Sequence, residues 1–161
     1  MKKSPIDVNT LSDLFFEFES KLQFFERKFL KEYGIDDVTP NEVKVLYMIG
    51  MTNSKSMSEI ADKLKVTHGT LSITVNSLVK KGYVIRNRHK QDRRIIILYL
   101  TKKSLRVIKL YARIYEEIFT QALKDMSSKE FNVIISTLTN INQLLDTNFY
   151  EGIESDEEDQ E

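Results

Sequence analysis

Apolar residues recur at helical spacing over most of the chain, and at strand spacing in only one short region. Residues 7–33 predict a long helix, because six apolar side chains follow one another at intervals of three and four. Phe16 and Phe24 lie off this stripe, so a second face of the helix is apolar too. Gly34 is the expected stop. The stripe consists of Leu11, Phe15, Phe18, Leu22, Phe25 and Phe29.

Three capping signals predict shorter helices after this segment. Thr39-Pro40-Asn41-Glu42 combines an N-cap residue with proline at the first helical position, and predicts a helix to about Met51. Ser56-Met57-Ser58-Glu59 is a capping box that opens a second helix, containing Ile60, Ala61 and Leu64. Thr67 caps a third helix over 68–81, which Gly82 closes. The inner face expected for this third helix is Leu71, Val75, Leu78 and Val79.

The pattern then changes to strands. Residues 83–86 and the β-branched run 95–100 predict two strands, and the polar, basic segment 87–94 between them predicts a hairpin tip. Thr101 caps another long helix, and the capping box 127–130 opens the last one. The apolar stripe of the first of these helices is Leu105, Ile108, Ala112, Tyr115, Phe119 and Ala122. The apolar stripe of the last helix is Phe131, Ile134, Ile135, Leu138, Ile141 and Leu145.

This order of elements predicts a mainly α fold, a winged helix-turn-helix with a two-stranded β-hairpin wing and with dimerisation helices at both ends. We expect an N-terminal dimerisation helix in 1–39, a DNA-binding domain in 40–101, C-terminal dimerisation helices in 102–150 and a disordered acidic tail in 151–161. The near-heptad stripes of the outer helices favour a homodimer interface. Core packing within one chain is the alternative.

Composition alters this picture in two ways. The 161 residues carry 24 bases and 24 acids, but residues 151–161 hold seven acids and no base, which leaves a net charge of +7 on residues 1–150. Such asymmetry is typical of a nucleic-acid-binding body. The absence of cysteine excludes disulfides, thiolate-bound zinc and iron–sulfur clusters. We expect no cofactor and no metal, and with no visible signal peptide or membrane span we expect a cytoplasmic location.

The basic charge is concentrated around the hairpin. Residues 80–106 contain ten bases and a single acid, Asp92. A solvated surface is the usual explanation of a charge run, but such surfaces normally mix positive and negative residues. Phosphate oxygens are the natural counter-charge of a cluster that is almost entirely positive, so this segment predicts nucleic-acid binding. The expected contacts in the hairpin are Arg86, Arg88, Lys90, Arg93 and Arg94.

The helix over 68–81 has the composition of a DNA-reading helix. Small polar side chains let a helix lie deep in a major groove, where asparagine can bond the N6/N7 edge of adenine and isoleucine can touch a thymine methyl. An ordinary polar helix surface is the alternative. Gly69 is unfavourable in a helix, and either close approach to DNA or a tight helix contact explains it. The expected contacts are Thr67, His68, Gly69, Thr70, Ser72, Ile73 and Asn76.

Several motifs resemble those of the MarR family of bacterial regulators. Asp92-Arg93-Arg94, followed by Leu98-Tyr99-Leu100-Thr101, is similar to the family's wing signature, and Glu59-Ile60-Ala61 and Gly82-Tyr83-Val84 match its flanking helix pattern. The resemblance covers about residues 10–148. It implies a homodimer on a pseudo-palindromic operator in double-stranded DNA, with Arg94 in the minor groove and Asp92 holding Arg94 in place.

Within that family, Lys80-Lys81-Gly82-Tyr83 and Gln91-Asp92-Arg93-Arg94 resemble the repressors of fatty-acid synthesis genes. That resemblance implies an effector, either a small molecule or acyl carrier protein bearing a long acyl chain. Ser104 departs from the pattern, since many relatives have glycine there. The phenylalanine-rich first helix fits an acyl tunnel and core packing equally well, and any pocket is expected where the outer helices meet the DNA-binding lobe.

Two other function classes have less support from the residues than DNA binding. An enzyme is not expected, because the only histidines, His68 and His89, have no carboxylate or second histidine at ligand spacing, and there is no phosphate-binding glycine loop. A winged-helix module that binds protein instead of DNA is the alternative function. The acidic tail is either a solubilising segment or a competitor that folds over the wing.

Overall fold

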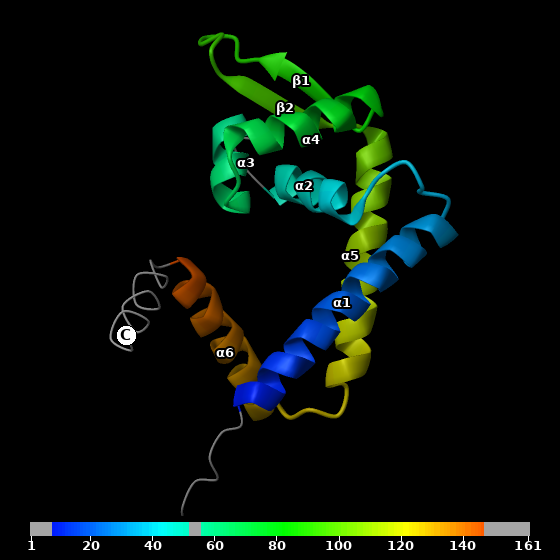
Figure 1. Cartoon of the computed structure of the whole chain (residues 1–161). Coiled ribbons are helices and arrows are strands. Elements are labelled where there is room, and N and C mark those ends of the chain that lie inside the picture. Colours follow the sequence, from blue (N-terminus) through cyan, green and yellow to red (C-terminus); the bar gives the residue numbers. More distant parts are fainter. Residues whose placement is uncertain (1–7, 52–55, 147–161) are drawn as a thin grey trace, which may run out of the picture. The chain divides into compact units, whose positions relative to one another are not determined.

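The computed structural model describes residues 8–51 and 56–146, and its elements follow the order expected from the sequence (Figure 1). The expected tail over 151–161 lies outside the described residues. The mainly α fold with one two-stranded hairpin is confirmed. The elements are α1 (Val8–Glu32), α2 (Pro40–Met51), α3 (Met57–Leu64), α4 (His68–Lys80), β1 (Val84–Arg88), β2 (Ile96–Leu100), α5 (Lys102–Leu123) and α6 (Ser128–Asp146).

Side-chain caps begin the helices where the sequence predicts them. At α2, Thr39 Oγ1 accepts from the N–H of Glu42 at 3.2 Å, while the Glu42 carboxylate accepts from the N–H of Thr39 at 2.8 Å. Ser127 and Glu130 repeat this reciprocal pair at α6. Each cap satisfies backbone donors that the first helical turn leaves without an intrahelical partner, so these boundaries follow from local chemistry.

Glycines end α1 and α4. Gly34 and Gly82 have φ values of +68° and +76°, a region that side chains with a Cβ rarely adopt. After α4, the N–H of Gly82 bonds the carbonyl of Val79 and the N–H of Tyr83 bonds the carbonyl of Leu78. This is the Schellman pattern, and it turns the chain directly from α4 into the hairpin.

The hairpin differs from the prediction at both strands. β1 extends to Arg88, beyond the expected 83–86, because Arg88 pairs with Ile96 across an antiparallel register in which Val84 faces Leu100. Tyr83 lies just outside the strand. β2 begins at Ile96 because the N–H of Ile95 is used in the turn, where it bonds the carbonyl of Asp92. Strand pairing thus overrides the low strand propensity of the polar residues in β1.

One hydrophobic core holds the hairpin against α2, α3 and α4. Of the expected inner face of α4, Leu71, Val75 and Leu78 are buried, but Val79 is 37% exposed, so its assignment to the core was wrong. Val79 follows Leu78 by one residue and therefore points about 100° away around the helix. The fully buried residues of this core include Val43, Leu46, Ile49, Ile60, Ala61, Leu71, Val75, Leu78, Tyr83 and Leu98.

The chain divides into two compact units, Met1–Arg113 and Ile114–Glu161, with the division inside α5. In the second unit, α6 buries none of its residues, and its apolar side chains face outward. In the first, α1 buries Glu26 and Leu30 but leaves most of its predicted stripe exposed.

Candidate nucleic-acid interface

α4 presents a short polar surface on its outer side. Thr67 caps the helix by accepting from the N–H of Thr70 at 3.1 Å, and the two threonine hydroxyls bond each other at 2.9 Å. Ile73 is 74% exposed, so it contributes little to the packing of the core. Of the predicted contacts on this helix and its cap, Thr67, His68, Gly69, Thr70, Ile73 and Asn76 are exposed and Ser72 is half-buried.

Gly69 has no close neighbour that would require a glycine. A Cβ placed there would meet only the Thr67 hydroxyl, at 3.8 Å, which is ordinary van der Waals contact. Of the two explanations that the sequence leaves open, a tight intramolecular helix contact therefore has no support in the structure. Close approach of DNA to the first turn of α4 stays a prediction.

The far end of α4 is anchored by a carboxylate from α2. Glu42 is 7% exposed and accepts from Ser77 Oγ at 2.7 Å and from Lys81 Nζ at 2.7 and 2.8 Å. Burial alone would raise the pKa of Glu42, but the hydrogen bonds from Lys81, Thr39 and Ser77 outweigh it and hold the pKa below its ordinary value. One carboxylate therefore fixes the start of α2 to the end of α4.

The hairpin tip is built as a hydrogen-bonded turn. Asp92 Oδ1 accepts from the backbone N–H of Arg94 at 2.9 Å, and His89 Nδ1 accepts from the N–H groups of Gln91 and Asp92, both at 3.4 Å. The family resemblance predicts that Asp92 holds Arg94 in place. In the structure Asp92 bonds the backbone of Arg94, and no ion pair joins Asp92 to the Arg94 guanidinium among the described residues. Around this turn, Arg88, Lys90, Arg93 and Arg94 are exposed.

One hydrogen bond joins the hairpin to α4. Arg86, half-buried in β1, donates from Nη1 to Asn76 Oδ1 at 2.9 Å. A pocket of about 730 Å³ lies beside them, and histidine and arginine side chains from α4 and the hairpin share its lining with the residues that begin α3. The residues that the structure brings together here are Ser56, His68, Ser72, Arg86, His89 and Arg94.

The base of the hairpin is tied to two other elements. Asp37, in the loop between α1 and α2, accepts from Tyr83 Oη and from Lys103 Nζ, each at 2.6 Å, and the Lys103 ammonium lies 4.0 Å from the centre of the Tyr83 ring. Burial acts to raise the pKa of Asp37, but these hydrogen bonds lower it. The buried Ser104 hydroxyl donates to the carbonyl of Tyr83, which gives a structural role to the residue that departs from the glycine of many relatives.

Two of the ten clustered bases are therefore paired with acids of the same chain. Lys81 pairs with Glu42 and Lys103 with Asp37. The remaining positive charge lies mainly on the hairpin and on the surface beside it, with Asp92 as the one acid in that segment. These acidic partners were missed by the sequence analysis. The capping box at 39–42 marked Glu42 as a helix start, but nothing local indicated its second contact with α4.

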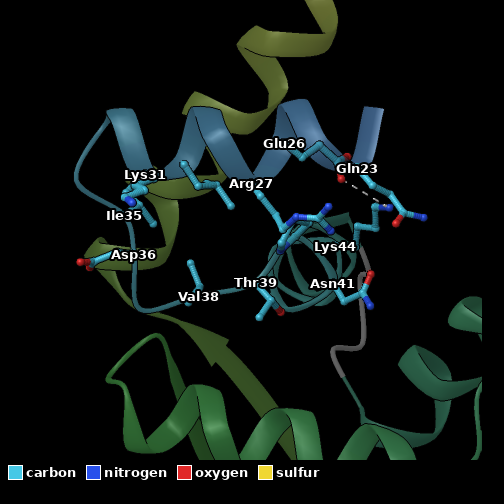
Figure 2. A pocket seen from close by; sticks show the side chains of 12 residues that line it. Gln23, Glu26, Arg27, Lys31, Ile35, Asp36, Val38, Thr39, Asn41 and Lys44 are labelled. Carbon is cyan, nitrogen blue, oxygen red and sulfur yellow. Dashed lines mark ion pairs between the residues drawn. The ribbon is translucent and has the colours of Figure 1, made fainter. Parts of the chain in front are cut away.

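A second site lies on the other side of α2. A pocket of about 440 Å³ is lined by α1, by the loop that follows it and by the first turn of α2, with basic side chains at its rim (Figure 2). Among the lining residues, Glu26 is fully buried, accepts from Tyr111 Oη, and lies 3.9 Å from Lys44 Nζ. Glu26 is four residues from both Leu22 and Leu30, a spacing that marks the inner face of α1 and that the sequence analysis did not use. Polar lining residues include Gln23, Arg27, Lys31, Asn41 and Lys44.

Other kinds of site are not evident in the described part of the chain. Over residues 8–51 and 56–146, no helix has the length and apolarity that a membrane crossing requires. Within the same residues, no group of three or more histidines and carboxylates is placed to hold a metal ion.

Comparison with known proteins gives a consistent result. A model of the MarR family matches residues 36–95. SarZ, an HTH-type transcriptional regulator of Staphylococcus aureus, is 29% identical over 112 residues, which cover 70% of this chain and 72% of SarZ. A crystal structure of Streptococcus pneumoniae FabT in complex with DNA superposes with a TM-score of 0.80 at 28% identity, covering 87% of this chain and 98% of that one. The Staphylococcus aureus MepR–DNA complex shares the fold, with a TM-score of 0.70 at 20% identity over 82% of this chain and 96% of that one.

Proposed function

Because the chain belongs to the MarR family of transcriptional regulators, we propose that it binds a pseudo-palindromic operator in double-stranded DNA as a homodimer. The relatives named above are regulators, and the chain is a regulator and not an enzyme. The observation that carries the proposal is the concentrated positive charge of the hairpin, which lies beside an outer face of α4 that is exposed among the described residues. Such a regulator works where the bacterial DNA is, in the cytoplasm.

In this proposal α4 enters a major groove and the hairpin reaches the adjacent minor groove. The exposed outer face of α4 supplies the base contacts, from His68, Gly69, Thr70, Ser72, Ile73 and Asn76, and Thr67 contributes at the cap. Arg86, Arg88, Lys90 and Arg93 supply charge for the phosphates, and Arg94 enters the minor groove, where arginine senses groove width. Asp92 sets the direction of Arg94 through the turn that it shapes.

The exposed apolar faces support the homodimer. In α6, Phe131, Leu138 and Ile141 follow a near-heptad spacing and are 42%, 50% and 42% exposed, and no described residue of the helix is buried. A helix with an uncovered apolar stripe of this length needs a partner surface. A second copy of the chain supplies one, and it also gives two copies of α4 for half-sites about 34–36 Å apart.

The dimer is tested by mass in solution. Sedimentation equilibrium should give about twice the chain mass of 18.9 kDa. Leu138→Glu should shift the equilibrium towards the single chain, because it places a charge on the stripe. Gln143→Glu is the matched control, since residue 143 lies about 140° away around the helix. A wild-type chain of single mass would contradict the proposal.

We also propose that the protein represses fatty-acid synthesis genes and responds to an effector. The similarity to FabT and the resemblance of the segments around Lys80 and Gln91 support this assignment. The pocket between α1 and α2 is the proposed effector site (Figure 2). Its apolar part suits a hydrocarbon chain, and its rim, with Arg27, Lys31 and Lys44, suits an acidic group.

A route from this pocket to α4 exists in the hydrogen bonds. Thr39 lines the pocket and its N–H donates to Glu42, whose carboxylate accepts from Ser77 and Lys81 at the end of α4. An effector changes DNA affinity only by favouring one arrangement of the two α4 helices over another. Acyl carrier protein carrying a long acyl chain, added to the protein and its operator, should change operator affinity, and an affinity equal to that with unacylated carrier would contradict the effector assignment.

The DNA-binding proposal is tested by selecting bound fragments from the genome that encodes the chain. The protein should enrich a small set of fragments that share an inverted repeat, and the neighbouring genes should include those of fatty-acid synthesis. The alternative function, a winged helix that binds protein, predicts no enriched sequence and an affinity for DNA that does not vary with salt.

A further inference from the structure

The bond between Arg86 and Asn76 determines what Asn76 can offer to a base. Arg86 is the third residue of β1, two positions beyond the buried Val84, so its side chain lies on the strand face that is turned towards α4. There its Nη1 meets Asn76 Oδ1 at 2.9 Å. The contact joins α4 and β1, the two elements that carry the proposed DNA contacts. No motif in the sequence predicted that these two residues bond each other.

The chemistry of the pair fixes the orientation of the amide. A guanidinium has donors only, so the group of Asn76 that faces it is the carbonyl oxygen. An isolated asparagine can rotate its amide and present either end to a partner. Beside Arg86 one orientation is favoured, and the planar amide then directs the Nδ2 donors away from the hairpin. Asn76 is exposed, so these donors are open to a partner outside the protein.

We propose that Arg86 determines the base specificity of Asn76 by making it a hydrogen-bond donor. On the proposed function, Asn76 then bonds an acceptor in the major groove, which is N7 or O6 of guanine, O4 of thymine or N7 of adenine. The bidentate adenine contact expected for a free asparagine also requires Oδ1 to accept from the N6 amino group. Beside Arg86 that amino group meets an oxygen already bonded to a cation and a positive charge next to it, so adenine is disfavoured.

A neighbouring residue separates this role from simple phosphate binding. Arg88 lies two positions further along β1, carries the same charge, and makes no hydrogen bond or ion pair with α4 among the described residues. Arg86→Met and Arg88→Met remove the same charge from the same strand. Only the first frees the Asn76 carbonyl, so a difference between them isolates the orienting role from electrostatic attraction.

The experiment is a selection from duplexes whose operator half-site is randomised, performed with the full chain, Arg86→Met and Arg88→Met. With Arg86→Met we expect the preference at one base pair in each half-site to fall by roughly tenfold or more, or to change to adenine, with the other positions retained. With Arg88→Met we expect the wild-type sequence preference, weaker binding to all sequences, and a salt slope smaller by about 0.9.

A third variant keeps the fold and the contact. Asn76→Asp retains an acceptor for Arg86 but has no donor, so the preference for an acceptor base at the same position should be lost. Thermal melting followed by circular dichroism confirms that each variant is folded. An unchanged preference with Arg86→Met, or the same uniform loss with both arginine variants, would overturn the inference and leave Arg86 as a phosphate contact. A wild-type chain that enriches no sequence would overturn the proposed function, and this inference with it.

Discussion

Glu42 is the residue whose removal tests most sharply how α4 is held. Glu42→Gln keeps the shape of the side chain and one carbonyl oxygen but removes the negative charge. The substitution leaves Lys81 without its ion-pair partner and places an amide where two acceptor oxygens serve Thr39, Ser77 and Lys81. We expect the protein to remain folded at 25 °C with a lower free energy of unfolding.

The size of the effect follows from burial. A hydrogen bond to a charged group contributes about 1.5–3 kcal/mol. Removing one partner of a fully buried pair costs about 3–5 kcal/mol. The Lys81 side chain is 30% exposed, so its ammonium group can be hydrated in Glu42→Gln, and the cost should lie nearer the first of these two ranges. We therefore expect a loss of about 2–3 kcal/mol, or roughly 4–12 °C in the melting temperature of a chain of this size.

The effect should depend on pH in a defined direction. The pKa of Glu42 in the folded protein is lower than its ordinary value of 4.5. A carboxyl group whose pKa is depressed by folding stabilises the protein fully above the ordinary value, and loses that contribution as the pH falls through the folded value. The difference between wild type and Glu42→Gln should therefore be constant near neutral pH and shrink below about pH 4.5.

Urea unfolding followed by far-ultraviolet circular dichroism measures this difference at each pH. Glu59→Gln is the matched control, since Glu59 occupies the same position in the capping box of α3 but, among the described residues, its carboxylate pairs with the half-exposed Lys63 alone. The control should lose about 0.5 kcal/mol or less. Equal losses for the two variants, or a Glu42→Gln difference that does not change with pH, would refute the assignment of Glu42 as the anchor of α4.

Three further changes test the hairpin and its surroundings. Arg94→Ala should leave the melting temperature unchanged, because only the backbone of Arg94 is bonded, and should weaken operator binding by about 1–3 kcal/mol. Lys129→Ala, which removes the same charge from α6, is the control. Equal operator affinity of the two variants would refute the wing assignment. Ser104→Ala should lower the free energy of unfolding by about 1–3 kcal/mol in the same urea assay, because the carbonyl of Tyr83 loses a buried donor, and unchanged stability would contradict this. Gly69→Ala should stabilise the fold by about 0.5–1 kcal/mol and reduce operator affinity, and an unaltered affinity would remove the argument for close approach of DNA.

The sequence predicted the elements well because their ends are local. Caps such as Thr39 with Glu42, and glycines such as Gly82 at positive φ, depend on residues a few positions apart. The end of β1 was predicted less well, because it depends on the pairing of Arg88 with Ile96, eight residues further along the chain. Strand ends depend on a partner, and helix caps do not.

The candidate interface was predicted as a set of residues but not as a set of contacts. Charge counting located the hairpin arginines, and helical periodicity located the outer face of α4. Neither could show that Arg86 bonds Asn76, 10 residues away, or that Glu42 bonds Lys81, 39 residues away. Nor could they show that Asp37 bonds both Tyr83 and Lys103, which are 46 and 66 residues away. Such contacts depend on tertiary packing, and local sequence patterns carry little information about them.

Equilibrium binding of the full chain to its selected operator, at a series of salt concentrations, tests the central claim most directly. A duplex of the same length and composition with a shuffled sequence serves as the reference. The account predicts that the operator binds at least roughly 10³-fold more tightly than the shuffled duplex. It also predicts that log affinity falls against log salt by about 0.9 for each phosphate contacted. Equal affinity for the two duplexes, with no dependence on salt, would contradict it.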